Sequence, residues 1–230
     1  MQQIARNIRK DTLRTIQVKG GHTAINLSTA DILTALYFKA LKHNPRQPKT
    51  GDKIFVTSKL TPVWQTTLAH AGYFAKKNLL ENADLPKGTT YALSTAIGSA
   101  IAAKMDGKDH HTYCITTDSE IDWQAIMLAG KQKLNLTLII DRNNLSKEGF
   151  MDIEPLRQKL EAFNWNIIEA DGHKIEHVIE ALQEARNDKP TAIICHTIPG
   201  KGVSFMEHNP EWYDKKPDKE EMEKAISEMK

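Results

Sequence analysis

The second half of the chain alternates short apolar runs with amphipathic stretches, and this pattern limits the possible folds more than any other feature. Four runs are typical of strands, at 111–116, 136–141, 165–170 and 191–197. Their starts lie roughly 25 to 30 residues apart with one helical pattern in each gap, which is the spacing of β-α-β crossovers. The pattern predicts an α/β fold: a doubly wound, mostly parallel sheet with helices on both faces.

The first 107 residues are mostly helical by pattern. We expect helices over 1–17, 28–43, 60–83 and 93–107, with one strand over 53–58. Ser28 is the expected N-cap of the second helix, and Gly107 is the expected end of the fourth. Residues 1–230 are expected to form a single domain, with a mainly helical part (1–107) and an alternating β/α part (108–230).

Charge and cysteine content argue against several classes of protein. Lysine plus arginine number 31 against 29 for aspartate plus glutamate, so a net charge of +2 gives no electrostatic case for nucleic acid or an anionic membrane as partner. Cys114 and Cys195 lie inside apolar runs without zinc-site spacing, which fits a reducing cytoplasm. No run approaches the roughly 18 to 20 apolar residues of a membrane span or resembles a signal peptide, so we expect a soluble, unprocessed protein.

Two polar residues follow neighbouring strands of the predicted sheet. Ligands bind at the carboxyl ends of parallel strands, where Asp118 and Asn143 stand. A carboxylate and an amide oxygen are the hard ligands that Mg²⁺ prefers. A helix opening directly after Asp118 would turn free N–H groups toward a phosphate. The residues therefore allow a joint site for magnesium and phosphate.

The same residues also have a purely structural interpretation. Thr117 to Glu120, reading TDSE, satisfies the S/T-x-x-E capping box, which alone would explain all four residues. Asn143 and Asn144 suit a turn or a left-handed conformation after a strand. The residues by themselves leave both interpretations open.

Longer segments carry a family resemblance over nearly the whole chain. They read, in order, STADILTALYFKALKHNP, DKIFVTSKLTPVWQTTLAHAGYF, LNLTLIIDRNNLSKEG, FNWNIIEADGHKIEHVIEALQEA and KPTAIICHTIPGKGVSFMEHNPEW. These segments are similar to successive parts of the N-terminal half of transketolase, and in particular to the separate N-terminal subunit of split transketolases. The resemblance implies a thiamine-diphosphate-binding fold of the type that holds the diphosphate (PP-type).

By this resemblance, the chain binds the diphosphate of thiamine diphosphate through Mg²⁺. The implied metal ligands are Asp118, Asn143 and the backbone carbonyl of Leu145. The implied cofactor-binding residues are Thr117, Asp118, Ser119, Glu120, Asn143 and Leu145. The family's G-D-G is here Thr117-Asp118-Ser119, so Cβ atoms crowd the approach of the backbone to the diphosphate. The loop after Glu120 is also shortened, and we expect this chain alone to bind the cofactor weakly or undetectably.

The resemblance also implies a set of substrate histidines, of which one is kept. His22 matches the family's G-H-P-G, here GHTA, and is the catalytic candidate, although a turn or surface role would suit it equally. The family's S-K-G-H reads SKLT here, so Thr61 stands in the place of the histidine. The family's W-H-G reads WYD here, so Tyr213 stands in the place of the histidine. A fourth histidine, before the segment 88–94, has no counterpart. Each general acid or base contributes roughly 10²-fold to 10⁴-fold in rate, so the loss of three histidines should greatly lower the rate of reactions on sugars.

Two functions of different class follow. In the first, the chain is the N-terminal subunit of a two-carbon ketol transferase acting on sugar phosphates, and a complementary subunit with pyrimidine-binding and C-terminal domains is obligatory. That predicts a two-plus-two assembly. In the second, the chain is a cofactor-poor, transketolase-like pseudoenzyme that serves as a scaffold or regulatory partner.

Overall fold

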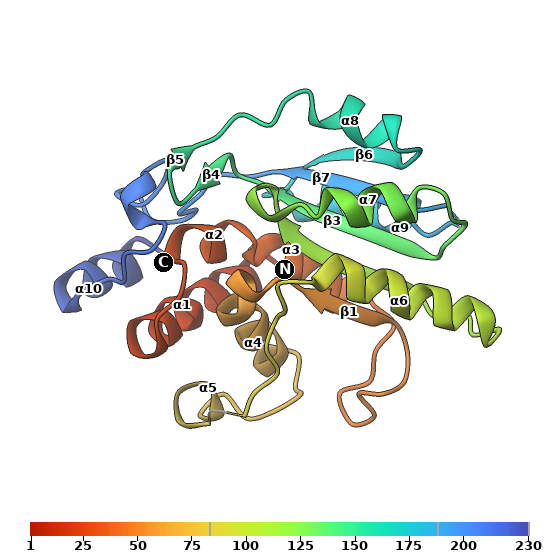
Figure 1. Cartoon of the computed structure of the whole chain (residues 1–230). Coiled ribbons are helices and arrows are strands. Elements are labelled where there is room, and N and C mark those ends of the chain that lie inside the picture. The colour runs from red at the N-terminus through yellow and green to blue at the C-terminus, as the bar shows by residue number, and fades with distance from the viewer. Residues whose placement is uncertain (83, 188, 230) are drawn as a thin grey trace.

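The computed structural model describes residues 1–82, 84–187 and 189–229, and its centre is one parallel sheet (Figure 1). The strand order is β1-β2-β3-β7-β6, and every neighbouring pair is parallel. The strands are β1 (Lys53–Val56), β2 (Thr112–Thr117), β3 (Leu136–Arg142), β6 (Asn166–Asp171) and β7 (Thr191–His196). A separate antiparallel hairpin joins β4 (Leu145–Ser146) to β5 (Gly149–Phe150). The predicted parallel sheet is confirmed.

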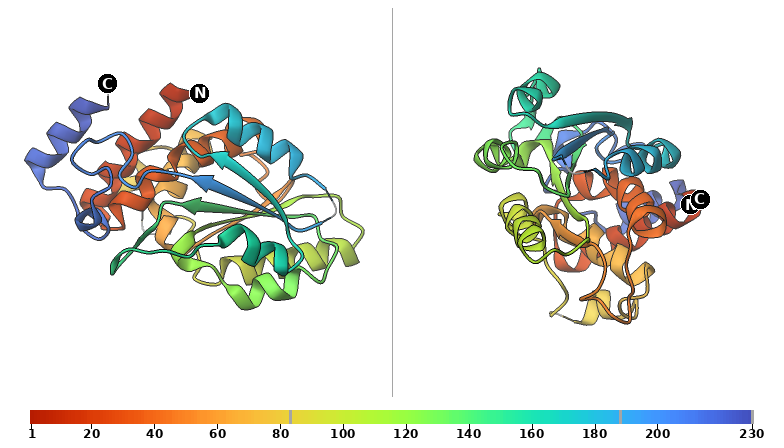
Figure 2. Two further views of the ribbon diagram at one scale, coloured as in Figure 1. Left: turned by 90° about the horizontal axis from the view of Figure 1, so that it is seen from above. Right: turned by 90° about the vertical axis from the view of Figure 1, so that its right-hand side faces the viewer.

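Helices cover both faces of the sheet (Figures 1 and 2). One face carries α6 (Ala92–Met105), α7 (Trp123–Ala129) and α8 (Leu156–Ala162), and the other carries α3 (Ala30–Ala35) and α9 (Ile175–Glu184). Side chains alternate between two cores: Leu138 and Ile140 of β3 join the first, and Ile139 joins the second. Right-handed crossovers explain the layers, because the chain advances from β1 to β6 over one face and returns to β7 over the other.

The remaining helices gather beside one face and end of the sheet. They are α1 (Gln2–Lys19), α2 (Thr23–Ser28), the π-helix η1 (Leu36–Ala40), α4 (Thr61–His70), α5 (Asn78–Glu81) and α10 (Lys219–Glu228), with 3₁₀ turns η2 (Ser58–Leu60), η3 (Asp118–Glu120) and η4 (Pro210–Trp212). α10 packs on α1, which brings the two termini close together (Figure 2). None of the described helices is both long and apolar enough to cross a membrane.

Two predicted helices differ from those observed. The helix predicted over 28–43 starts earlier, at Thr23, and Ser28 is not its N-cap. The fully buried Ser28 hydroxyl instead donates to the backbone carbonyl of Ile25 and to the side chain of Asp141. The helix predicted over 60–83 is divided into α4 and α5, because Gly72 takes a left-handed φ of 87° just after α4. Gly107, with φ 64°, follows α6 as predicted.

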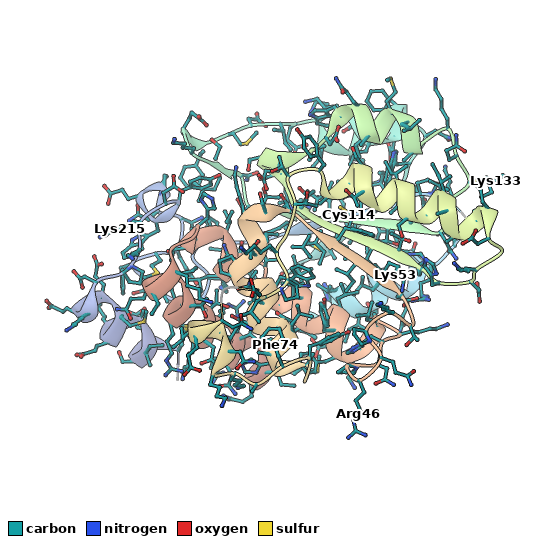
Figure 3. All side chains as sticks on the ribbon, turned by 60° about the horizontal axis from the view of Figure 1, so that its bottom comes forward. Arg46, Lys53, Phe74, Cys114, Lys133 and Lys215 are labelled. Atoms are coloured by element: carbon teal, nitrogen blue, oxygen red, sulfur yellow. The ribbon has the colours of Figure 1, made fainter. Side chains whose placement is uncertain are left out.

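Both cysteines lie in the sheet with free thiols. Cys114 is in β2, where Figure 3 labels it, and Cys195 is in β7. Burial raises the pKa of each thiol well above its usual range, so neither is a reactive thiolate. Positions 83, 188 and 230, which the predicted single domain spans, lie outside the described residues.

Candidate functional site

Asp118 follows β2 directly, at the carboxyl edge of the sheet. Its Oδ2 atom accepts hydrogen bonds from Arg142 Nη1 at 2.9 Å and from the backbone N–H of Asn144 at 2.7 Å. The other oxygen, Oδ1, is buried and has no hydrogen-bond partner among the described residues. Burial raises the pKa of the Asp118 carboxyl to about 6, against the lowering effect of the Asn144 hydrogen bond. One buried carboxylate oxygen is therefore open to a further ligand.

Arg142, the last residue of β3, places a permanent positive charge beside this carboxylate. Its Nη2 atom donates to Glu154 Oε1 at 2.9 Å, so the guanidinium bridges a buried acid and an exposed one. The side chain of Asp118 is fully buried, and the ion pair offsets part of the cost of keeping its charge out of water.

Asn143 lies one residue beyond β3, and its side-chain amide is held at both ends. Nδ2 donates to Asp141 Oδ2 at 3.1 Å, and Oδ1 accepts the backbone N–H of Leu145 at 2.9 Å. Asn144 then takes a left-handed φ of 61°, as the turn interpretation predicted. The turn does not exclude a ligand role, since an amide oxygen has two lone pairs and Oδ1 uses one of them here.

Asp141 sets the orientation of that amide. This fully buried carboxylate accepts hydrogen bonds from Ser28 Oγ at 2.6 Å, from Thr29 Oγ1 at 2.7 Å and from Thr197 Oγ1. Burial raises the pKa of the Asp141 carboxyl, against the lowering effect of these hydrogen bonds. Its Oδ2 atom accepts from Asn143 Nδ2 and so holds the amide by its donor end. The Oδ1 acceptor of Asn143 is thereby turned away from Asp141.

If Mg²⁺ binds here as the family resemblance implies, we expect Asp141→Asn to weaken its binding about tenfold. A substituted amide that turns its NH₂ group toward Asn143 Nδ2 removes the acceptor that holds the Asn143 side chain. The measurement is a calorimetric Mg²⁺ titration with thiamine diphosphate and the partner subunit present. The control is Ser28→Ala, which removes one donor to Asp141 without touching Asn143. It should lower the free energy of unfolding by about 1 kcal/mol and leave Mg²⁺ affinity unchanged. Equal Mg²⁺ affinities in both variants would show that Asp141 has only a structural role.

The donor set fits a magnesium ion. Asp118 Oδ1 is buried and unpartnered, and Asn143 Oδ1 retains a lone pair. Leu145 is buried at the start of β4, in the turn that Asn143 closes, so its carbonyl belongs to the same loop. All three are hard oxygen donors of the kind that Mg²⁺ takes. Within residues 1–82, 84–187 and 189–229, no three histidine, cysteine or acidic side chains gather in a metal-binding cluster of another kind.

The predicted capping box at Thr117 to Glu120 is wrong. The hydroxyls of Thr117 and Ser119 lie 3.1 Å apart and bond to each other. Glu120 accepts a hydrogen bond from Thr57 Oγ1 and lies 3.3 Å from Lys59 Nζ. The box fails because these partners, which follow β1, engage the glutamate that the box required.

The helix predicted directly after Asp118 is also displaced. Residues 118–120 form a single 3₁₀ turn, and α7 begins only at Trp123. Asp122 is its N-cap, accepting the N–H of Ala125 at 3.0 Å and the hydroxyl of Ser94 at 2.8 Å. A protein carboxylate thus occupies the start of α7, where a phosphate was expected.

A cavity of about 610 Å³ lies near this edge of the sheet. Its lining residues come from the ends of α1 and α4 and from the loops beside them: Thr15, Lys19, Gly20, Gly21, His22, Ser58, Lys59, Thr61, Pro62, Gln65, Asn82 and Lys87. The Lys59 ion pair with Glu120 connects the cavity to the turn that carries Asp118.

Three positions singled out in the sequence lie around this cavity. His22 and Thr61 line it, and the ring of Tyr213 lies 5.0 Å from the His22 ring. His22 Nδ1 lies 2.5 Å from Asp214 Oδ1, close enough for an ion pair, although this nitrogen makes no hydrogen bond of good geometry within the described residues. The ammonium of Lys59 lies 5.6 Å over the Tyr213 ring. Residues far apart in the sequence thus form one polar pocket.

Comparison with known proteins places this arrangement in a family. Residues 85–223 match the model of the transketolase thiamine diphosphate binding domain. The chain is 35% identical over 243 residues to one of the subunits of the apulose-4-phosphate transketolase of Actinobacillus succinogenes, covering 92% of this chain and 88% of that protein. The chain belongs to the transketolase family.

Further relatives agree in sequence and in fold. A 6-deoxy-6-sulfo-D-fructose transketolase subunit from a Clostridium species is 32% identical, and the match covers 100% of this chain and 96% of that protein. The transketolase of Campylobacter jejuni superposes with a TM-score of 0.88 at 26% identity. That match covers 99% of this chain but 42% of the longer transketolase chain. A Pichia stipitis transketolase, at 20% identity and TM-score 0.90, supports the fold alone.

Sequence reasoning missed part of this transketolase-family site. Asp141 received no role, although a single acid closing an otherwise apolar run was a usable signal. Arg142 also received no role, and its ion pair with Asp118 had no local signal. The lysines of the cavity were also missed, because they come from separate segments that only the fold brings together.

Proposed function

We propose that this chain is the N-terminal, diphosphate-binding subunit of a two-chain transketolase that transfers a two-carbon ketol unit between sugar phosphates. The observation that carries the proposal is the open, buried Oδ1 atom of Asp118 beside Asn143 at the carboxyl edge of the sheet. The names of the relatives, which are subunits of transketolases acting on a sugar phosphate or a sulfosugar, support the reaction class.

In this proposal the chain holds Mg²⁺ through Asp118, Asn143 and the Leu145 carbonyl, and the segment Thr117–Glu120 lies against the diphosphate. Thiamine diphosphate, when bound, supplies the nucleophilic carbon that the two-carbon transfer requires. His22 lines the cavity with Asp214 on its Nδ1 side, which suits it to hold or move a proton at a sugar hydroxyl. These residue roles, and Mg²⁺ itself, are part of the proposal.

A complementary C-terminal subunit is the proposed partner. The match covers 42% of a transketolase such as that of C. jejuni but 88% and 96% of two relatives named as subunits, which supports a division of the enzyme between two polypeptides. Large apolar side chains at the N-cap of α6 and on the adjoining α7 support a covering partner: Tyr91 is 70% exposed, Met127 48% and Leu128 53%. We further propose that two copies of each of the two chains assemble, and that the complex is cytoplasmic.

One group of observations favours the alternative, a cofactor-poor scaffold. Thr117 and Ser119 place side chains where the family carries glycine, and their hydroxyls bond to each other. Thr61 and Tyr213 stand in the places of family histidines. Each of these changes weakens either the cofactor-binding site or the sugar-binding site.

The test is a reconstitution. We expect the chain together with the C-terminal subunit from the same organism to transfer ketol units in the presence of thiamine diphosphate and Mg²⁺, and expect neither of the two to do so alone. Release of the aldose product from a ketose phosphate is the measurement. A stable complex that neither binds the cofactor in calorimetry nor turns over would support the scaffold instead.

A further inference from the structure

His173 makes a hydrogen bond with each of its two ring nitrogens. It lies in the turn that follows β6, and its side chain is 13% exposed. Nε2 accepts the backbone N–H of Ile198 at 2.8 Å, and Nδ1 lies 2.9 Å from Asp31 Oδ2. A backbone amide can only donate its hydrogen, so Nε2 carries no proton and the hydrogen of the neutral ring is on Nδ1. The contacts therefore select one tautomer of the imidazole.

Asp31 and Arg9 fix the same tautomer from the other side of the ring. Asp31 is buried in α3, and its Oδ2 atom also accepts a hydrogen bond from Arg9 Nη2. Although burial raises the pKa of Asp31, the hydrogen bond from His173 and the charge of Arg9 bring it below its usual range. An ionised carboxylate can only accept, so His173 donates through Nδ1. The guanidinium already neutralises this carboxylate, which favours a neutral imidazole.

The bond to Ile198 continues the hydrogen bonding of the sheet past the end of β6. Just before it, Thr197 donates its N–H to the carbonyl of Arg142 in β3, at 3.0 Å. The next N–H along an extended chain points to the opposite side, toward β6, which has already ended at Asp171. The imidazole of His173 lies on that side and supplies the acceptor that a strand would have supplied. It thus holds the chain where β7 leaves the sheet.

The segment 198–214, which starts at this bond, leads to His22. Near its start, Gly200 donates its N–H to a carbonyl in the first turn of α2, at 2.9 Å. A Cβ atom on Gly200 would lie 2.2 Å from a carbonyl oxygen later in the segment, so the segment is folded tightly on itself. Its far end carries Tyr213 and Asp214, which lie beside His22. A tightly folded segment passes a shift at one end to the other.

We infer that His173 is a positioning residue for the cavity that His22 lines. Held in one tautomer, its imidazole fixes the start of the segment 198–214 and so the placement of Tyr213 and Asp214 against His22. His173 is not among the residues that line the cavity, so it acts through the segment. The inference rests on the proposed function, because it assigns the cavity to the substrate.

Two substitutions separate the two bonds of the ring. His173→Gln keeps an acceptor, Oε1, in the place of Nε2, whereas His173→Asn keeps a donor, Nδ2, in the place of Nδ1. Only His173→Asn therefore leaves the Ile198 N–H without an acceptor. The control is His177→Asn, on the exposed face of α9, which should change nothing in either experiment below.

The first experiment uses NMR on the isolated full-length chain. The parent should show the tautomer of His173 with the hydrogen on Nδ1. The Ile198 amide should exchange its hydrogen about tenfold faster in His173→Asn than in His173→Gln, since one buried hydrogen bond is lost. The ring signals of His22 should shift in His173→Asn alone. A hydrogen on Nε2 in the parent, or His22 signals alike in the two variants, would overturn the inference.

The second experiment measures turnover of a ketose phosphate by the two-chain complex. His173→Asn should raise KM about tenfold over His173→Gln and leave kcat nearly unchanged, because substrate contacts are displaced while the cofactor site is kept. Equal KM values in the two variants of an active complex would contradict the positioning role alone. A parent complex without turnover would instead refute the proposed function, and with it the role of His173 in substrate binding.

Discussion

Asp118→Asn should weaken Mg²⁺-dependent binding of thiamine diphosphate to the two-chain complex by about 100-fold or more. The substitution keeps the size of the side chain but removes its negative charge. Asp118 supplies the only carboxylate in the proposed ligand set of Asp118, Asn143 and the Leu145 carbonyl. Calorimetric titrations with and without Mg²⁺ measure the effect directly, independently of turnover. The parent chain without its partner should bind the cofactor weakly or undetectably under the same conditions.

A matched control for this substitution is Asp122→Asn. Asp122 lies four positions further along and caps α7, and asparagine caps a helix about as well as aspartate. The complex with Asp122→Asn should bind the cofactor as tightly as the parent complex does. If Asp118→Asn binds the cofactor with unchanged Mg²⁺ dependence, Asp118 is not a metal ligand, and its role is limited to its contacts with Arg142 and the Asn144 N–H.

The double variant Thr117→Gly, Ser119→Gly should raise cofactor affinity about tenfold in the presence of Mg²⁺ and the partner. Removing both side chains lets the backbone come closer to the diphosphate. The same change should lower the free energy of unfolding by about 2 kcal/mol, since two glycines increase the entropy of the unfolded chain and the buried methyl of Thr117 is lost. Calorimetry and chemical denaturation measure the two effects separately.

The control here is Thr117→Ala, Ser119→Ala, which removes the paired hydroxyls but keeps both Cβ atoms. Its cofactor affinity should stay near that of the parent, because the Cβ atoms still crowd the backbone. A glycine variant that binds no better than the alanine variant would argue for the scaffold function, with Asp118 as a structural residue at the end of β2.

Much of the fold was predictable because its signals are local. Each strand of the sheet is an apolar run, and each crossover helix has the length and periodicity that a parallel sheet requires. Asp118 and Asn143 follow neighbouring strands β2 and β3, so their approach was also predictable from topology. The family resemblance supplied the metal and cofactor roles, which remain predictions.

The tertiary structure decided which partner each polar group takes. Ser28 was expected to cap a helix, yet its hydroxyl donates a hydrogen bond to the buried Asp141. An unsatisfied buried carboxylate would cost more free energy than an uncapped helix start. Glu120 was expected to close a capping box, yet it bonds to Thr57 and Lys59 on the loop after β1. Local motifs name the groups that can bond, whereas contacts between distant segments determine which bonds form.

The cavity shows the same limit most clearly. Lys19, Lys59 and Lys87 are separated by tens of residues, and in the sequence each looks like an ordinary surface lysine. Periodicity predicted the elements that carry them, and the near-neutral total charge gave no hint of a cationic pocket. Only the folded chain brings these lysines around one cavity without a carboxylate in its lining, because electrostatic potential depends on distances in space and not on separation along the chain.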